Sequence, residues 1–536
     1  MDETEFFNKL GFEEDPFKFT NADDEDKLEQ YFIPPPYFDS VWGNPKKPRP
    51  TFIFAPRGAG KSAQRRMIES KSNEYGKVLC ITYSRFEFDG KKLDDINIID
   101  HIHQILTVGT VGLLTYLNSN KDLIEKLNET EKKVLKTLIQ EYLGNIHEFE
   151  LKAAIDSLKS FSEKAKNFWN NYFGAINMLV TGLLQSLNLQ GVNIVKFDAD
   201  EKKLARSYKY MLEMFRDLCL KIGFESVYVL LDKVDESELT GNKAEDSFKM
   251  IQSMVRDLEL LEMDKFGFKF FLWDQLGSHF REYSRPDRVE QFTLEWSNEE
   301  LEQMLAQRLS AYSGGKITDL EQITTKFQED ITPLVILFAQ KSPRDAIRIC
   351  KQIIAEQREI NPNSTRIDSK AIIEGIENFC KIRALEITDE MKIRELRKIG
   401  FVEFTSPYLA TDVFKISKNG ARSKVSGWEN LGVVKKVGTK TVKTSDRPVN
   451  NYNISDIRVA KYVFEKMSVL EFIRDKYNKC PNCSEVLLRD WDIPQKRDCP
   501  KCGHEIKLLV NNKVQMKFKA EKRMGKSSYQ TNLSDF

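Results

Sequence analysis

Four short apolar runs in the N-terminal half set the pattern of this chain. They are Thr51–Phe54, Val78–Tyr83, Val227–Leu231 and Phe268–Trp273. Each is rich in aliphatic, aromatic and β-branched residues, which is typical of strands buried on both faces of a parallel sheet. Stretches with helical periodicity separate the runs, so the sequence predicts an α/β core.

Helical periodicity dominates two longer regions. Between about 94 and 221, apolar residues recur at three- and four-residue spacing, as in Leu123–Tyr142 and Phe149–Phe173, which predicts a helical insertion in the core. A second helical region starts at a capping box, Ser297 with Glu300, and continues beyond Ser342-Pro343, where Ser is a helix cap and Pro the first helical residue. This region predicts a helical lid.

The pattern changes again after about residue 390. Thr411–Ser417 and Ala421–Asn430 predict two short helices, and Val433–Val437 and Asn451–Ile454 predict strands flanking a polar loop. Two helices followed by a β-hairpin predict a winged helix. The predicted domains are a lead-in (1–50), a P-loop core (51–295) with the insertion (about 94–221), a helical lid (296–390), a winged helix (391–470), a zinc ribbon (471–510) and a basic tail (511–536).

Length and charge narrow the class of protein. A chain of 536 residues exceeds a single core, and 41% hydrophobic residues exclude wholesale disorder. The net charge is +1, but residues 391–536 carry 30 Lys and Arg against 16 Asp and Glu. That C-terminal region of net charge +14 is therefore the part expected to meet a polyanion such as DNA or RNA.

No membrane or secretory signal is expected from the sequence. The charge-free stretch His101–Asn120 holds too many polar residues to span a bilayer, and Met1–Glu5 lacks the basic and apolar regions of a signal peptide. Cys80, Cys219, Cys350 and Cys380 lie in apolar contexts typical of reduced, buried thiols. These observations predict a cytoplasmic protein.

A phosphate-binding loop follows the first apolar run directly. Thr51–Phe54 leads into Ala55-Pro-Arg-Gly-Ala-Gly-Lys-Ser62, and a helical stretch begins at Ala63. Strand, glycine-rich turn, Lys-Ser and helix is the context of a P-loop, although Ala55 replaces its first glycine. Backbone N–H groups and the helix N-terminus would cradle ATP phosphates, with Lys61 on the β/γ-oxygens and Ser62 on Mg²⁺. The predicted nucleotide-binding residues are Gly58, Ala59, Gly60, Lys61, Ser62, Ala63 and Asp232.

Carboxylates follow the third apolar run, where a P-loop needs them. Asp232 comes directly after Val227–Leu231, so it is predicted at the carboxyl edge of the sheet as the second Mg²⁺ partner. Asp235 and Glu236 lie in the next turn, and either could orient the attacking water. We favour Glu236 for its reach, while Asp235 could simply cap the next helix.

Three arginines are further candidates at the nucleotide. Arg285 and Arg288 lie in a loop that could present an arginine to a neighbouring subunit's nucleotide, and Arg344 lies at the start of a lid helix. Solvated surface arginines are the alternative for all three.

These motifs in this order resemble AAA+ and STAND ATPases. The similarity is closest to replication-initiator-like, origin-recognition-type ATPases, and the lead-in motifs Asp15-Pro16-Phe17 and Tyr31–Phe38 resemble prokaryotic relatives of anti-phage defence loci. Two features depart from that pattern. The P-loop and Asp232 are about 170 residues apart, and Lys233 stands where an acidic residue commonly follows the aspartate.

The C-terminal modules carry the remaining chemistry. Cations of the winged helix and its loop would contact nucleic-acid phosphates, with Trp428 in the core, although winged helices also dock proteins. Cys480, Cys483, Cys499 and Cys502 form C-x₂-C-x₁₅-C-x₂-C, which predicts a closed four-thiolate Zn²⁺ site with His504 as a bystander; redox pairs are the alternative. The winged-helix cations are Arg422, Lys424, Lys440, Lys443 and Arg447.

The sequence thus predicts an oligomeric ATPase that switches conformation with its nucleotide and acts on a nucleic acid or an effector protein, with anti-phage defence as the setting that the resemblance implies. One alternative is a nucleotide-gated scaffold that recruits an effector protein. A second alternative is a motor that translocates DNA.

Overall fold

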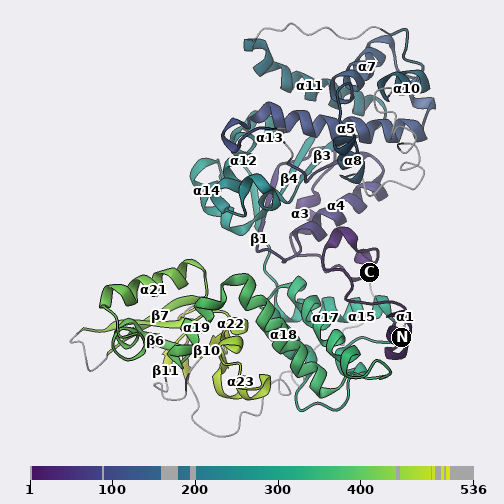
Figure 1. The fold of residues 1–536 in the computed structure, drawn as a ribbon. Helices are drawn as coiled ribbons and strands as arrows, with labels where there is room; N and C mark the ends of the chain where they lie inside the picture. Colours follow the sequence, from purple (N-terminus) through teal and green to yellow (C-terminus); the bar gives the residue numbers. More distant parts are fainter. Residues whose placement is uncertain are drawn as a thin grey trace, which may run out of the picture. The chain divides into compact units, whose positions relative to one another are not determined.

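The protein folds into two compact units. The computed structural model describes residues 3–86, 88, 90–157, 169, 179–192, 201–441, 447–483, 486–488, 490, 496–499 and 502–507. Asn21–Trp296 form one unit, here the core unit, and Met1–Thr20 with Ser297–Phe536 form the other, the C-terminal unit (Figure 1). The predicted tail 511–536 lies outside the described residues. No helix in the described part of the chain is long and apolar enough to cross a membrane.

One parallel sheet organises the core unit. Its strand order is β2-β3-β4-β1-β5, and each neighbouring pair is parallel. This sheet and its flanking helices match the predicted α/β P-loop core of AAA+ type, and the four predicted strands are confirmed. The strands are β1 (Thr51–Ala55), β2 (Val78–Tyr83), β3 (Ser226–Leu231), β4 (Phe266–Trp273) and β5 (Glu290–Thr293).

The edge strand β5 was not predicted from the sequence. Its residues Glu290-Gln291-Phe292-Thr293 are mostly exposed, and it pairs with β1 through the register Thr51↔Glu290 to Phe54↔Thr293. Because these side chains are exposed, β5 needs no apolar run, and its sequence carries no hydrophobic signal. The other edge strand, β2, is buried and was predicted from its apolar residues.

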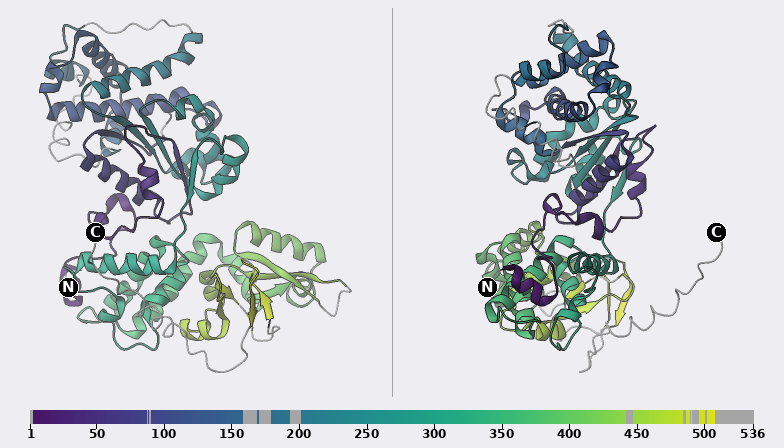
Figure 2. Two further views of the ribbon diagram at one scale, coloured as in Figure 1. Left: turned by 180° about the vertical axis from the view of Figure 1, so that it is seen from behind. Right: turned by 90° about the vertical axis from the view of Figure 1, so that its right-hand side faces the viewer.

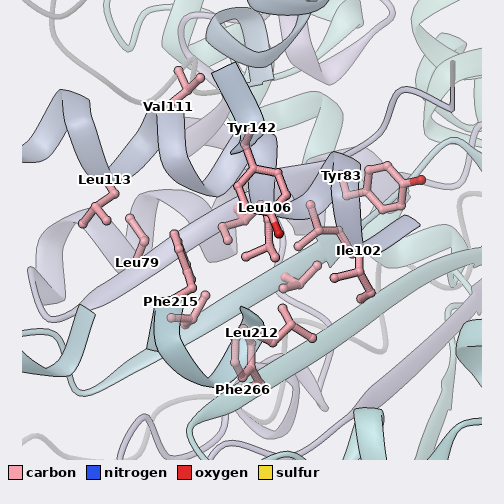
Figure 3. Close-up of a cluster of buried hydrophobic side chains, with 14 of the residues drawn as sticks. Leu79, Tyr83, Ile102, Leu106, Val111, Leu113, Tyr142, Leu212, Phe215 and Phe266 are labelled. Atoms are coloured by element: carbon pink, nitrogen blue, oxygen red, sulfur yellow. The ribbon is translucent and has the colours of Figure 1, made fainter. Parts of the chain in front are cut away.

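Side chains of the central strands alternate between two apolar layers. Phe52 and Phe54 of β1 point into a large cluster beneath the inserted helices, whereas Ile53 points into a smaller cluster with Phe38 and Ile68. Figure 3 shows the large cluster, in which Leu106 and Phe215 come from two different helices. Burial on both faces explains why these strands read as nearly continuous apolar runs.

Helices cover both faces of the sheet. The helix after β1 lies by the smaller cluster, and α5 with its neighbours covers the larger one (Figure 1). Within the predicted insertion the described residues are mainly helical, whereas 158–168, 170–178 and 193–200 lie outside them. Among its described residues, the helices of the core unit are α2 (Leu28–Tyr31), α3 (Phe38–Trp42), α4 (Lys61–Tyr75), α5 (Ile98–Ser119), α6 (Asp122–Glu125), α7 (Glu129–Leu143), α8 (Glu148–Ser157), α10 (Leu179–Ser186), α11 (Glu201–Lys221), α12 (Ala244–Arg256), α13 (Leu258–Leu261) and α14 (Gly277–Tyr283).

A buried lysine interrupts the apolar pattern of β4. Lys269 is 1% exposed, and its ammonium donates to the Arg49 carbonyl oxygen at 2.8 Å. Burial lowers the pKa of Lys269 to about 7, and the Glu290 carboxylate only partly opposes that shift. The folded protein therefore holds this lysine largely neutral above pH 7, where an unfolded chain would keep it charged.

Lys269 gives the protein a stability that rises with pH. Between about pH 7 and 10 the unfolded chain binds one more proton at this residue, so the free energy of unfolding should increase by up to ~1.4 kcal/mol per pH unit from this group. Lys269→Met should remove this dependence and stabilise the protein at pH 7. Urea unfolding at several pH values checks both, and equal pH slopes for the two proteins would contradict it.

The C-terminal unit starts as a helical layer. The segment around Pro16 and Phe19 contacts α15, where the buried Arg308 guanidinium donates to the carbonyl oxygens of these two residues. The capping box of Ser297 and Glu300 and the Ser342 cap are both confirmed. The helices are α1 (Glu3–Leu10), α15 (Asn298–Tyr312), α16 (Ile331–Ala339), α17 (Pro343–Ile360), α18 (Ser369–Ile387) and α19 (Glu390–Ile399).

An antiparallel sheet of order β6-β8-β7 follows, with α21 beside β7 (Figure 2). Trp428 of α21 is 1% exposed, which confirms its predicted place in the core. These elements are β6 (Glu403–Thr405), α20 (Ser406–Tyr408), α21 (Lys418–Asn430), β7 (Val434–Lys440), β8 (Val449–Ile454), α22 (Ile457–Val463) and α23 (Val469–Lys476).

The predicted helix Thr411–Ser417 was wrong. A turn capped by Thr405 begins at Ser406-Pro407 and continues as a π-helical turn over Leu409–Val413. Lys415 then has a φ of +53°, which lies in the left-handed region and ends the helical conformation. The hairpin strands are also longer than predicted and leave a shorter loop, of which 442–446, including Lys443, lie outside the described residues.

Candidate nucleotide site and zinc site

The candidate nucleotide site begins where β1 ends. Two glycines shape the loop from Pro56 to Gly60, because Gly58 and Gly60 have φ values of +80° and +98°, which favour residues without a Cβ. Gly60 is the N-cap of α4, so the helix begins at Lys61 and its first N–H groups face the loop. The predicted strand, loop and helix are thus present in the predicted order.

Lys61 lies over its own loop. Its ammonium donates to the carbonyl oxygens of Ala55 at 3.1 Å and of Pro56 at 3.3 Å. Ser62 and Ala63, the next two residues, are half-buried in the first turn of α4. The helix N-terminus and the Lys61 ammonium together give this end of β1 a positive potential suited to an anion.

Aromatic residues support the loop from one side. The Trp296 indole N–H donates to the Ala59 carbonyl oxygen at 2.7 Å, and Ala59 is almost fully buried. Tyr37 stacks on Phe292 with 4.7 Å between ring centroids, and burial raises the pKa of Tyr37 to about 12. These contacts fix the backbone of the loop from residues far away in sequence.

Arg57 connects the loop to the acidic turn after β3. Its guanidinium donates to the Asp235 carboxylate at 2.7 Å and to the Asn242 side chain at 3.2 Å. The same group stacks on the Trp273 ring at 4.1 Å from its centroid. Asp235 is buried, with 4% of its surface exposed. The sequence did not indicate that its carboxylate would pair with Arg57.

Asp232 lies at the end of β3, at the predicted edge of the sheet. One of its carboxylate oxygens accepts from Arg65 Nε at 3.1 Å, and the other accepts from the Lys233 backbone N–H at 2.9 Å. The Asp232 side chain is 1% exposed. A Mg²⁺ ion prefers several waters and an open carboxylate, so this paired and buried carboxylate does not fit a direct Mg²⁺ ligand.

Glu236 differs from both aspartates. It ends the short 3₁₀ turn Val234–Glu236 and is exposed, whereas Asp232 and Asp235 are buried. Because the Glu236 side chain is exposed, solvent water reaches its carboxylate. The geometry is therefore compatible with Glu236 as a general base, a role that stays a prediction.

The three candidate arginines lie on the surfaces of their units. Arg285 pairs with Asp287 at 3.1 Å, and Arg288 pairs with Glu262 at 2.8 Å, with about half of each arginine side chain exposed. Arg344 is exposed in the first turn of α17 in the C-terminal unit. Their roles at a nucleotide stay predictions.

Exposed cations lie on α21 and the β7–β8 hairpin. Arg422, Lys436, Lys440 and Arg447 are exposed, whereas Lys424 is half-buried and bonds the Glu395 carboxylate. Lys424 is therefore less available to a phosphate than the sequence suggested.

The four predicted cysteines come together. The four sulfur atoms, of Cys480, Cys483, Cys499 and Cys502, all lie within 4.8 Å of one another. Hydrogen bonds from the Asn482 amide and from the His504 backbone lower the pKa of the Cys502 thiol to about 6, which favours its thiolate form. Four thiolates in one cluster fit a closed structural Zn²⁺ site, and such an ion would hold the two knuckles together. The strands here are β9 (Tyr477–Lys479), β10 (Val486–Leu488), β11 (Lys496–Asp498) and β12 (Glu505–Lys507).

Asp490 attaches this cysteine module to the β6-β8-β7 sheet. Its carboxylate accepts from the backbone N–H groups of Val402 at 2.8 Å and Glu403 at 3.1 Å, and from the Lys476 ammonium at 2.6 Å. In the sequence Asp490 lies between the two cysteine pairs, so these hydrogen bonds connect the cysteine module directly to the sheet.

Sequence reasoning missed several residues of the nucleotide site. Asp23, Arg65 and Trp296 contact the site from the lead-in, the P-loop helix and the end of the core unit. Arg57 lies inside the recognised motif, so its charge there was the one available signal. The others carry no local pattern, because their contacts span long distances along the chain.

Comparisons with known proteins give only remote similarity. The sequence matches no family model and no curated protein. Among solved structures, the Orc1 protein of Aeropyrum pernix in complex with DNA shares 10% identity at a TM-score of 0.37, over 85% of this chain and 98% of that one. The Orc2 protein of the same organism, in ADPNP and ADP complexes, has 11% identity and a TM-score of 0.35 over 84% and 98%. Cdc6p of Pyrobaculum aerophilum has 10% and 0.33 over the same shares. At these identities and TM-scores the comparisons assign this chain to no family.

Proposed function

We propose that this protein is a P-loop ATPase that binds its nucleotide at the carboxyl end of β1 and couples the nucleotide state to a nucleic acid held by the C-terminal unit. The observation that carries the proposal is the loop from Pro56 to Gly60, which joins a buried parallel strand to a helix N-terminus with Lys61 at its start. This geometry supports binding of a phosphate chain.

The residues divide the work in this proposal. Backbone N–H groups of Gly58, Gly60 and the first turn of α4 hold phosphate oxygens, and Lys61 leaves the Ala55 and Pro56 carbonyls to contact them. Glu236 accepts a proton from the attacking water. Arg57 keeps the loop and the turn with Asp235 at a fixed separation through its ion pair.

Glu236→Gln is expected to bind ATP normally and hydrolyse it at least about 100-fold more slowly, because removal of a general base typically costs 10²–10⁴ in rate. A phosphate-release assay with a parallel ATP-binding measurement checks both expectations. Asp235→Asn is the control, since its main effect should be a lower melting temperature through the loss of the Arg57 ion pair. The assignment is wrong if only Asp235→Asn slows hydrolysis.

A nucleic acid is the partner we favour for the C-terminal unit. Exposed Arg422, Lys436 and Lys440 lie on the helix and hairpin of a winged-helix fold, and the region 391–536 carries the net charge of +14. Helix and hairpin cations of this kind contact phosphates in such modules.

Replacing Arg422 and Lys440 together by alanine should weaken duplex binding and reduce the slope of log affinity against log salt by about two, since each neutralised phosphate contributes about 0.9. Gel-shift titrations at several salt concentrations measure the slope. Lys424→Ala is a matched control, because its ammonium already bonds Glu395. The absence of duplex binding by the wild-type protein at physiological salt would contradict the proposal.

A nucleotide-gated scaffold is the second candidate, favoured by Asp490, which fixes the cysteine module to the winged-helix sheet as one docking surface. Strong stimulation of ATP turnover by DNA would favour the ATPase or a DNA motor over the scaffold. The ATPase proposal has three further parts that come from the sequence resemblance. They are self-assembly with Arg285 or Arg288 acting on the nucleotide of a neighbouring subunit, STAND-type switching, and a role in anti-phage defence.

A further inference from the structure

The carboxylate of Asp232 belongs to a buried ionic cluster. Arg65, 4% exposed, donates to Asp232 at 3.1 Å and also contacts the carboxylates of Glu69 and Asp23. Although burial alone would lower it, these three carboxylates raise the pKa of Arg65 above its usual value. The guanidinium is therefore charged and committed to three acidic partners.

A second cation closes the cluster from the lead-in side. The Lys233 ammonium donates to Asp23 at 2.6 Å, on the oxygen that Arg65 does not contact. Lys233 follows Asp232 in the sequence and has a φ of +63°, in the left-handed region. In this conformation its backbone N–H donates to the Asp232 carboxylate. The Thr82 hydroxyl also donates to the Glu69 oxygen that Arg65 contacts.

The lead-in is tied to the same helix by a neighbouring arginine. The Arg66 guanidinium donates to the carbonyl oxygens of Ala22 at 2.6 Å and Glu25 at 3.0 Å. Asp23 thus lies in a segment held on α4 from both sides. The cluster, made of Asp23, Arg65, Glu69, Asp232 and Lys233, connects the lead-in to β3 and the P-loop helix.

A divalent ion on Asp232 would have to displace part of this cluster. Mg²⁺ requires near-octahedral oxygen ligands and keeps several waters, yet Asp232 is buried and both of its oxygens already accept hydrogen bonds. Removing Arg65 from its partners would leave a buried charge without compensation, which is far costlier than leaving the ion pair intact.

We infer that Asp232 is not a metal ligand in this protein but the anchor of the ionic cluster, and that ATP binds without a divalent ion on this carboxylate. The inference rests on the proposed function in one respect, that the P-loop binds ATP. It adds that Asp23, in a segment preceding the P-loop, is a positioning residue of the nucleotide site.

The first test measures ATP affinity by calorimetry in excess MgCl₂ and in excess EDTA. The same pair of titrations is made with Asp232→Asn, because an ion held by Ser62 and the phosphates alone would also be lost in EDTA. The inference predicts that the ratio of the two Kd values in Asp232→Asn matches the wild-type ratio within about twofold, and a clearly smaller dependence on Mg²⁺ in Asp232→Asn would overturn it. Absence of ATP binding in both buffers would instead contradict the proposed function, and the second test would still decide the role of the cluster.

The second test compares two neighbouring aspartates without nucleotide or metal. Asp23→Asn should lower the melting temperature by on the order of 5 °C, because it leaves Arg65 and Lys233 with one carboxylate fewer. Asp24→Asn, an exposed neighbour in the same turn, should change it by about 1 °C or less. Asp23→Asn should also weaken ATP binding severalfold, in keeping with a positioning role. Equal melting temperatures for the two variants would contradict the inference that Asp23 stabilises the ionic cluster.

Discussion

Lys61→Ala is expected to weaken ATP binding by on the order of 100-fold and to leave the fold intact. In the structure the Lys61 ammonium donates to the carbonyl oxygens of Ala55 and Pro56, which are uncharged acceptors. A phosphate chain offers it charged oxygens instead, and a hydrogen bond between charged groups contributes about 1.5–3 kcal/mol. Calorimetric titration with ATP measures the loss.

Lys71→Ala is the matched control for this variant. Lys71 lies on the same helix and pairs with Asp39 at 2.8 Å through exposed side chains, so its removal should cost little in stability or in affinity. Circular dichroism and melting temperatures should show both variants folded. Wild-type ATP affinity in Lys61→Ala would remove the basis of the P-loop assignment.

Cys483→Ser is expected to abolish zinc binding and to unfold the cysteine module. Structural zinc supplies on the order of 10–16 kcal/mol to small modules of this type, more than the few short strands here could replace. Elemental analysis should find one zinc ion per wild-type chain and a strongly reduced content in the variant. Hydrogen exchange should accelerate in β9 and β10, and also in β6, because Asp490 bonds the backbone there.

His504→Ala is the control for the zinc site. His504 is exposed, and the four sulfur atoms already form a complete cluster without it. This variant should keep one zinc ion and wild-type exchange rates. A wild-type protein that is folded in this region and free of zinc would contradict the prediction.

The P-loop and the central strands were predictable because their signals are local. Thr51–Ala55 is buried on both faces, so each position must be apolar or small, and the loop after it needs glycine where φ is positive. The cysteine pairs were predictable for the same reason, since a tetrahedral site needs two closely spaced ligands from each of two turns. Apolar runs, glycines and ligand spacings are all visible within about ten residues.

The winged-helix region shows where local reasoning failed. Thr411–Ser417 has residues that tolerate a helix, but the turn from Ser406 uses them in a π-helical turn, and Lys415 adopts a left-handed conformation. The strand β5 was missed because its side chains are mostly exposed and carry no apolar pattern, whereas β2, at the other edge of the sheet, is buried and apolar.

What the sequence by itself determined is therefore the set of chemical groups and their local frames: a phosphate loop, three carboxylates after a buried strand, and four thiols in two pairs. The tertiary structure alone decided which partners those groups have. Asp235 meets Arg57 over 178 positions, and Asp232 meets Arg65 over 167. Whether a carboxylate is a ligand, a base or an anchor depends on its burial and on the charges beside it, and those are set by contacts between residues that no local pattern connects.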